Sequence, residues 1–146
     1  MNILVICADT FRADYLGCYG NSWIKTPHID KLAGEGIRFD EFYGEALPTI
    51  PARRVLYTGR KAFPFSYHQQ KGDMVQLPGW HPLYDEDITL AEHLSDLGYT
   101  TGLVSDLYHM MKPGKNFHRG FHSWEWIRGQ EADPFIPTSK PNQNVS

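Results

Sequence analysis

Hydrophobic and polar positions alternate along the chain in segments typical of strands and helices. Residues 3–7 form a continuous apolar run rich in β-branched side chains, a pattern that indicates a strand buried on both faces. Residues 37–43 alternate between apolar and polar positions, which predicts a second strand. Residues 99–105 predict a third strand of the same kind.

Start and stop signals predict three helices between and after these strands. A threonine followed by a proline opens residues 26–36, with the threonine as N-cap and the proline at the first position. A second helix is predicted from Thr49 to about Thr58, and a third begins at the capping box Thr89-Leu90-Ala91-Glu92. A glycine follows each of these segments, as is common at helix ends.

The order strand, helix, strand, helix, helix, strand predicts an α/β fold, a mostly parallel sheet flanked by helices. Residues 61–87 show no sustained period and are rich in proline, glycine and aromatics, so we expect a long loop there. Residues 134–146 contain three prolines and predict an irregular tail. With 146 residues, the chain suits one domain or part of one. Because the tail ends without an element, we expect residues 1–146 to be the truncated, amino-terminal portion of a longer domain.

Charge and composition exclude several classes of partner. The formal net charge is −3, from 14 Lys plus Arg and 17 Asp plus Glu, so no basic field favours nucleic acid. The two cysteines lie in different local settings and indicate no disulfide framework. No segment approaches the roughly 20 apolar residues of a membrane span. No basic segment followed by an apolar one opens the chain. We therefore expect a cytoplasmic protein that binds neither nucleic acid nor a membrane.

The start of the second predicted helix carries the pattern best suited to chemistry. In Pro48-Thr49-Ile50-Pro51-Ala52-Arg53 the predicted N-cap Thr49 and Arg53 lie four positions apart and share a helix face. Free N–H groups and the helix dipole favour an anion at this point, and the guanidinium fork suits sulfate or phosphate oxygens. The alternative is that Thr49 only caps the helix and Arg53 only forms a surface ion pair.

Two other polar groups follow predicted strands, where sites lie in open α/β sheets. Asp9 follows the first strand, and its carboxylate suits either a divalent cation or a turn. Asp106 and His109 follow residues 99–105. His109 is a candidate acid or hydrogen-bond donor, with Asp106 as its orienter or a second ligand, and a structural histidine is the alternative.

Residues 112–133 are dense in histidine, aromatic residues and arginine. Two interpretations remain open for this segment. Arg119 or Arg128 contacts an anion in a substrate cleft, or the tryptophans pack in a core and the charges form a solvated rim.

Three ordered motifs, taken together, resemble the opening of the sulfatases within the alkaline phosphatase superfamily. They are Ala-Asp-Thr-Phe-Arg-Ala-Asp-Tyr-Leu-Gly-Cys-Tyr-Gly at residues 8–20, Thr-Pro-His-Ile-Asp-Lys-Leu-Ala at residues 26–33, and Pro-Ala-Arg with Leu-Tyr-Thr-Gly-Arg within residues 51–60. Residues 88–133 resemble the family more loosely. The resemblance implies a sulfatase-like α/β fold.

The same resemblance assigns roles to residues of this chain. It implies that Asp9 and Thr49 ligate one divalent metal ion, with Ca²⁺ expected first and Mn²⁺ or Zn²⁺ as alternatives. It places Thr49 at the nucleophile position, with Arg53 steadying it and its developing charge. It implies that His109 lies near the substrate oxygens and that Asp106 binds substrate. The implied partners are a small anionic ester and a missing carboxyl-terminal half or an oligomer partner.

Two departures from the family pattern change the expected chemistry. Asp9 is followed by Thr10 where many sulfatases carry adjacent aspartates. Thr49 stands where the family forms formylglycine from cysteine or serine, and its β-methyl group prevents formation of that aldehyde. We therefore expect a hydrolase of sulfate or phosphate esters with metal-assisted attack by Thr49. The alternatives are a phosphodiesterase or phosphomutase that uses unmodified threonine, and a catalytically inactive fragment or pseudoenzyme.

Overall fold

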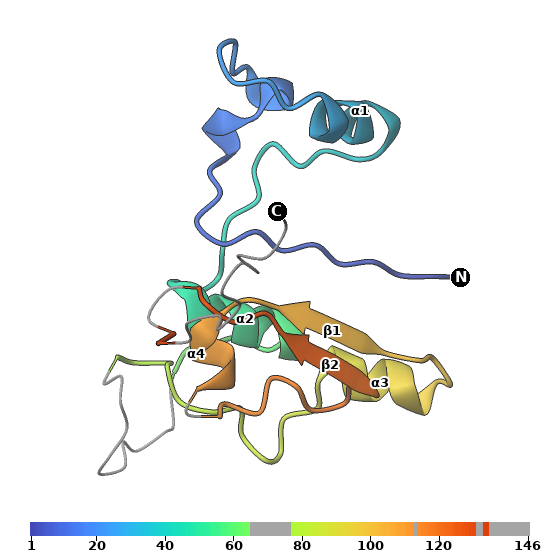
Figure 1. Ribbon diagram of the computed structural model, residues 1–146, viewed down its shortest axis with the longest axis vertical. Coiled ribbons are helices and arrows are strands. Elements are labelled where there is room, and N and C mark those ends of the chain that lie inside the picture. The colour runs from blue at the N-terminus through green and yellow to red at the C-terminus, as the bar shows by residue number, and fades with distance from the viewer. Residues whose placement is uncertain (65–76, 113, 131–132, 135–146) are drawn as a thin grey trace, which may run out of the picture. The chain divides into compact units, whose positions relative to one another are not determined.

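The computed structural model describes residues 1–64, 77–112, 114–130 and 133–134 and divides the chain into two compact units. The first unit is Met1–Tyr43 and the second is Gly44–Ser146 (Figure 1). No helix among the described residues is long and apolar enough to cross a membrane. The extent of the domain in the full-length protein stays a prediction.

The first unit is built from the 3-10 helices η1 (Ala13–Tyr15) and η2 (Gly17–Tyr19) and the α-helix α1 (Pro27–Glu35). Helix α1 begins and ends at the predicted positions. The hydroxyl of Thr26 accepts a hydrogen bond from the N–H of Gly17 at 2.9 Å and donates to Asp30 Oδ1 at 3.0 Å. Thr26 thus precedes α1 as predicted, but its side chain joins η2 to α1 instead of capping the helix.

The strands predicted at residues 3–7 and 37–43 are wrong. Both segments lie outside any strand, and the side chains of Leu4 and Ile6 are 83% and 82% exposed. An apolar run forms a strand only when neighbouring strands satisfy its backbone N–H and C=O groups. Among the described residues both paired strands belong to the second unit, so residues 3–7 have no partner within their own unit.

The second unit contains α2 (Thr49–Thr58), α3 (Leu90–Asp96), β1 (Gly102–Ser105), α4 (Tyr108–Met111) and β2 (Ser123–Trp126). The two strands pair in parallel, from Gly102 opposite Ser123 to Ser105 opposite Trp126, and point the same way in Figure 1. The α/β class and the parallel sheet are confirmed. The third predicted strand is confirmed in its second half, whereas the sequence patterns predicted neither α4 nor β2.

Helix α2 begins at Thr49, but Thr49 is not its N-cap. Pro48 holds the cap position with an extended backbone, and Thr49 is the first helical residue. The prediction was wrong because the carbonyl of Pro48 already accepts the first helical hydrogen bond, from the N–H of Ala52 at 3.2 Å. The other end is as predicted, since Gly59 has φ 65° and its N–H donates to the carbonyl of Val55 at 2.8 Å.

The capping box of α3 is confirmed. The N–H of Glu92 donates to Thr89 Oγ1 at 3.1 Å, and the N–H of Thr89 donates to Glu92 Oε2 at 2.8 Å. Burial would raise the pKa of Glu92, but the hydrogen bonds from Thr89 and the charge of Arg119 outweigh it and lower that pKa overall. The box therefore favours an ionised Glu92 at the start of the helix.

Replacing Thr89 by alanine tests this cap. We expect Thr89→Ala to lower the free energy of unfolding of the full-length protein by about 1 kcal/mol, because the N–H of Glu92 loses its acceptor. Urea denaturation measures the change. Thr100→Ala is the control, since Thr100 is exposed, and it should change stability by less than about 0.5 kcal/mol. Equal stabilities of the two variants would show that the cap contributes nothing.

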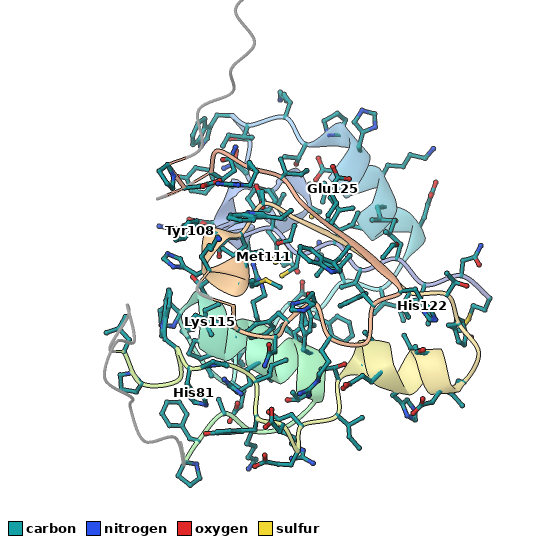
Figure 2. All side chains as sticks on the ribbon, turned by 60° about the horizontal axis from the view of Figure 1, so that its bottom comes forward. His81, Tyr108, Met111, Lys115, His122 and Glu125 are labelled. Carbon is teal, nitrogen blue, oxygen red and sulfur yellow. The ribbon has the colours of Figure 1, made fainter. Side chains whose placement is uncertain are left out.

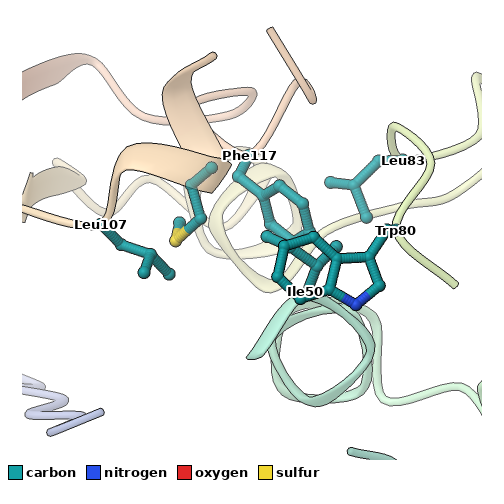
Figure 3. Close-up of a cluster of buried hydrophobic side chains, with 6 residues drawn as sticks. Ile50, Trp80, Leu83, Leu107 and Phe117 are labelled. Carbon is teal, nitrogen blue, oxygen red and sulfur yellow. The ribbon is translucent and has the colours of Figure 1, made fainter. Parts of the chain in front are cut away.

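The core of the second unit joins segments that are far apart in the sequence. Figure 3 shows its buried side chains, which are Ile50, Trp80, Leu83, Leu107, Met110 and Phe117. Tyr57 packs its ring edge-on against Phe117, with 5.3 Å between centroids, and Leu103 of β1 packs against the same cluster. The core therefore links α2, β1 and α4.

Trp80 and Leu83 enter this core from the segment predicted as a long loop. Residues 61–64 and 77–87 contain no helix or strand, while residues 65–76 of that prediction lie outside the described part. Most of the predicted tail, residues 135–146, also lies outside it. The described end of the predicted loop is thus irregular in backbone but contributes two core side chains.

Candidate functional site

The start of α2 presents two different faces. Ile50 and Arg54, four residues apart, are buried, at 0% and 4% exposure. Thr49 and Arg53 share the neighbouring face and are half-buried. The N–H groups of Thr49 and Ile50 precede the first helical hydrogen bond, because the carbonyl of Pro48 pairs with Ala52. A hydroxyl, a guanidinium and backbone donors therefore lie at one helix start, an arrangement suited to an anion.

His109 is connected to this helix start through the core. The ring of His109 contacts the Trp80 indole edge-on, with 4.9 Å between centroids, and Trp80 packs in the same cluster as Ile50 (Figure 3). His109 lies on α4 and is half-buried, whereas Asp106 is exposed between β1 and α4. The elements that carry Thr49 and His109 thus pack on the same hydrophobic core. The catalytic roles of His109 and Asp106 stay predictions.

Two of the predicted polar groups, Asp106 and His109, follow the carboxyl end of β1. Asp106 and Tyr108 follow β1, and His122 precedes β2 at the other end. Figure 2 shows Tyr108 and Met111 at α4 and His122 at the far end of the strands. Asp106 and His109 thus follow a strand as predicted, whereas Asp9 follows no strand.

Asp9 lies in the first unit, at a turn where Thr10 has φ 55° and donates its N–H to Asp9 Oδ1 at 3.1 Å. Thr49 lies in the second unit. Their oxygens suit a hard cation, but Ca²⁺ takes about six to eight oxygen ligands. In the part of the chain that the structure describes, no group of three or more His, Cys, Asp or Glu is placed to hold a metal. These residues alone therefore do not complete a Ca²⁺ site.

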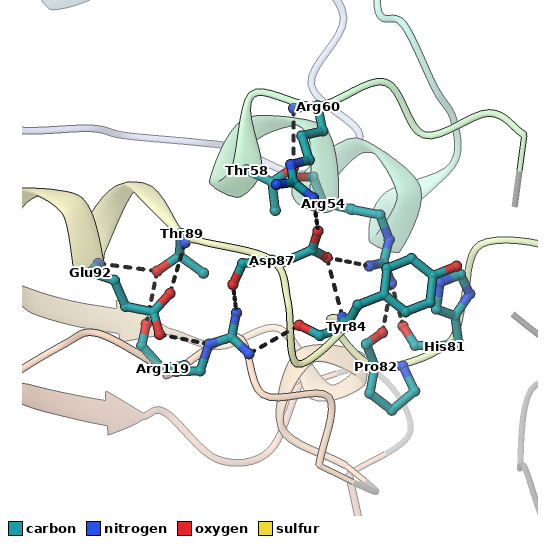
Figure 4. A network of polar contacts seen from close by, with 10 residues as sticks. All are labelled: Arg54, Thr58, Arg60, His81, Pro82, Tyr84, Asp87, Thr89, Glu92 and Arg119. Atoms are coloured by element: carbon teal, nitrogen blue, oxygen red, sulfur yellow. Dashed lines mark hydrogen bonds and ion pairs between the residues drawn. The ribbon is translucent and has the colours of Figure 1, made fainter. Parts of the chain in front are cut away.

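A buried arginine beside the predicted site was missed in the sequence. Figure 4 shows the guanidinium of Arg54, which donates from Nη2 to the carbonyls of His81 and Pro82 at 2.7 and 2.9 Å. Its Nη1 is 3.4 Å from Asp87 Oδ2, and its Cζ lies 5.1 Å from the ring centre of Tyr84. Burial lowers the pKa of Arg54, while Asp87 and Tyr84 act in the opposite direction. Arg54 nonetheless stays charged, as arginine does in proteins.

Asp87 is the acidic centre of this network. Its carboxylate accepts a hydrogen bond from Arg60 at 3.3 Å as well as from Arg54, and from the N–H of Tyr84 at 3.2 Å. Arg119 donates to the carbonyl of Tyr84 at 3.1 Å and to the carbonyl of Asp87 (Figure 4). The turn formed by residues 84–87 is thus held from α2 and from the segment before β2.

The two arginines proposed as anion contacts in residues 112–133 have local partners instead. Arg119 Nε lies 2.8 Å from Glu92 Oε1, so its charge supports the capping box. Arg128 donates twice to Asp133 at 2.6 Å, and its Cζ lies 4.3 Å from the ring centre of Trp126. The hydrogen bonds to Asp133 raise the pKa of Arg128. These contacts favour packing and ion pairing over an anion-binding role.

The fold and this helix start together define an α/β protein with an anion-suited site at a helix N-terminus. The family model described as Sulfatase matches residues 1–146. Human arylsulfatase A is 35% identical over 149 aligned residues, which cover 99% of this chain and 27% of that relative. Human arylsulfatase D is 37% identical over 70% of this chain and 18% of its own length.

A bacterial relative extends the comparison. The N-acetylgalactosamine-6-O-sulfatase of Bacteroides thetaiotaomicron is 35% identical over 70% of this chain and 19% of its own length. The chain belongs to the sulfatase family. It spans only 18–27% of the length of the three curated relatives named. No solved structure matches it.

Proposed function

We propose that the full-length protein is a hydrolase of sulfate or phosphate esters in which Thr49 is the nucleophile. The observation that carries this proposal is the shared face of Thr49 and Arg53 at the start of α2, next to a buried face that anchors the helix. The relatives whose names describe sulfatases support the class of substrate.

In the proposed reaction the oxygen of Thr49 forms a bond to sulfur or phosphorus as the bond to the ester oxygen breaks. The proton of Thr49 leaves to a base, and the released alkoxide takes up a proton to become the alcohol. Arg53 and the backbone donors at the start of α2 hold the anionic oxygens, whose charge shifts during the attack. Water then displaces Thr49 and releases sulfate or phosphate. His109 is proposed to donate a hydrogen bond to a substrate oxygen, and Asp106 to contact the substrate.

The proposal includes partners that this chain does not supply alone. A single divalent cation, Ca²⁺ before Mn²⁺ or Zn²⁺, is proposed to bind Asp9 and Thr49 together with ligands from the rest of the full-length protein or from an oligomer partner. The proposed substrate is a small anionic ester. Neither nucleic acid nor a membrane is proposed as a partner. The proposed location is the cytoplasm.

A phosphodiesterase or phosphomutase that uses unmodified threonine is the second candidate. One observation favours it, namely that Thr49 carries a β-methyl group and cannot form formylglycine. A catalytically inactive fragment or pseudoenzyme is the remaining hypothesis.

Product release from three substrates by the full-length protein separates these candidates. We expect saturable hydrolysis of an aryl sulfate or an aryl phosphate monoester. A chelator should lower the rate at least about tenfold, because removing the metal removes its stabilisation of charge in the transition state. Restoration by Ca²⁺, Mn²⁺ or Zn²⁺ identifies the metal. Hydrolysis of a phosphate diester alone would favour the phosphodiesterase form of the second candidate. Absence of hydrolysis of all three at every metal would support the inactive hypothesis and contradict the proposal.

A further inference from the structure

Arg54 is buried beside the proposed site and yet points away from it. Its side chain is 5% exposed, as is that of Asp87, and both terminal nitrogens are engaged with the segment 81–87 (Figure 4). Desolvating a guanidinium is costly unless its hydrogen bonds are replaced in a favourable geometry. The two carbonyls and the carboxylate provide that replacement for the two terminal nitrogens, whereas the buried Nε has no hydrogen-bond partner among the described residues.

The geometry of α2 connects this anchor to the reacting groups. Successive residues of an α-helix are about 100° apart around its axis, and residues four apart lie on one face. Ile50 and Arg54 therefore define one face and Thr49 and Arg53 the next. A rotation of the helix that moves Arg54 in its site turns Thr49 and Arg53 by the same angle.

The two anchoring residues differ in how strongly they resist such a rotation. Ile50 contributes an apolar contact, which depends on area and has little directional preference. Arg54 contributes a planar fork whose donors must meet acceptors at fixed directions. Further hydrogen bonds fix the position of Asp87, one of these acceptors. Its carboxylate also accepts from the N–H of Tyr84, and its backbone carbonyl accepts from Arg119.

We infer that Arg54 is a positioning residue that fixes the rotation of α2 and thereby aims Thr49 and Arg53 at the substrate. The inference rests on the proposed function. The acceptors that hold Arg54 are the carbonyls of His81 and Pro82 and the carboxylate of Asp87. Arg54 itself does not touch the substrate.

Steady-state kinetics of two variants of the full-length protein test this role. We expect Arg54→Met, which keeps a long side chain but removes the donors, to lower kcat at least about tenfold with KM changed less than about threefold, because small misplacements of reacting groups are costly. Arg54→Lys should recover part of the loss, since one ammonium group can replace some of the contacts. Assays run at a temperature at which both variants are folded by circular dichroism.

Two controls separate positioning from general stability. Thr89→Ala loosens the neighbouring capping box and should lower the unfolding temperature while leaving kcat within about twofold of wild type. Arg60→Met removes the other side chain that pairs with Asp87, from a residue whose side chain is 58% exposed, and should also leave kcat within about twofold. If Arg54→Met and Thr89→Ala lower kcat by equal factors at equal losses of stability, Arg54 is merely structural and the inference is wrong.

Thr49→Ala, measured in parallel, distinguishes failure of the inference from failure of the proposed function. An inactive Thr49→Ala with a fully active Arg54→Met overturns only the positioning role. A fully active Thr49→Ala overturns the proposed function and, with it, the inference. Binding of inorganic sulfate by titration calorimetry gives a readout that needs no turnover. Because KM is expected to change less than about threefold, Arg54→Met should weaken sulfate binding by a similarly small factor, and unchanged binding together with unchanged kcat overturns the inference.

Discussion

Replacing Thr49 by alanine in the full-length protein should reduce kcat by about 10⁴-fold or more, as loss of a nucleophile does in other hydrolases. The methyl group of alanine leaves no oxygen to attack sulfur or phosphorus. Thr49 is the first residue of α2 and not its cap, so the change removes the hydroxyl without removing a helix cap. Product release from the best of the three ester substrates measures the loss.

Two comparisons make this result specific. Thr100→Ala removes the hydroxyl of an exposed threonine and should keep kcat within about twofold of wild type. Thr49→Ser keeps a hydroxyl at the same position and should retain activity within about tenfold. Mass spectrometry of the wild-type peptide that contains Thr49 should find unmodified threonine. A changed mass at Thr49, or wild-type turnover by Thr49→Ala, would contradict direct attack by this residue.

Local signals in the sequence predicted the helices α1, α2 and α3 but not the short helix α4. The capping box at Thr89 and the glycine end of α2 depend on contacts between residues within one turn, so each signal contains its own partner. Gly36 also ends α1, but in an extended conformation. Two predicted caps were exceptions, since the side chain of Thr26 makes no cap hydrogen bond to α1 and Thr49 is not the cap of α2. There the proline carbonyl before Thr49 takes the first helical hydrogen bond, which residue preference alone does not reveal.

Local signals predicted the strands less well than the helices. Residues 3–7 have a clear strand pattern but no pairing partner within their unit, whereas β2 has a weak pattern and forms because Ser123–Trp126 aligns with β1. Strand formation depends on a partner elsewhere in the sequence. The family resemblance correctly predicted the α/β class because it draws on whole folds and not on single segments.

The candidate site, like the fold, was predictable where it depends on local spacing and not where it depends on distant contacts. The pairing of Thr49 with Arg53 follows from helical spacing, so it was found from the sequence. Arg54 was overlooked because a charged residue is seldom fully buried, although its spacing from the buried Ile50 places it on the core face. The contact between Trp80 and His109 joins a loop to α4 across the core, and no local sequence pattern predicts it.

Loss of the Arg53 side chain should have the second-largest effect on activity after loss of the Thr49 hydroxyl, and it should affect KM as well as kcat. We expect Arg53→Ala to lower kcat/KM by about 10²- to 10³-fold, because loss of one donor to a developing anionic charge has effects of this size. Unlike Arg54→Met, it should also raise KM, since Arg53 is proposed to hold the substrate oxygens before the attack as well as during it. Initial rates over a range of ester concentrations separate the two parameters.

The geometry of the guanidinium gives this prediction its sharpest test. Arg53→Lys keeps the charge but replaces a planar fork with a single ammonium group, so it should restore only part of the activity. Added guanidinium should raise the rate of Arg53→Ala and leave that of Thr49→Ala unchanged, because only the first variant retains the nucleophile and lacks the cation. Arg60→Ala, which removes a more exposed arginine just beyond α2, should show neither the loss nor the rescue. If Arg53→Lys matched wild type and guanidinium had no effect, Arg53 would contribute only charge, and a role for its planar fork in holding the substrate oxygens would be wrong.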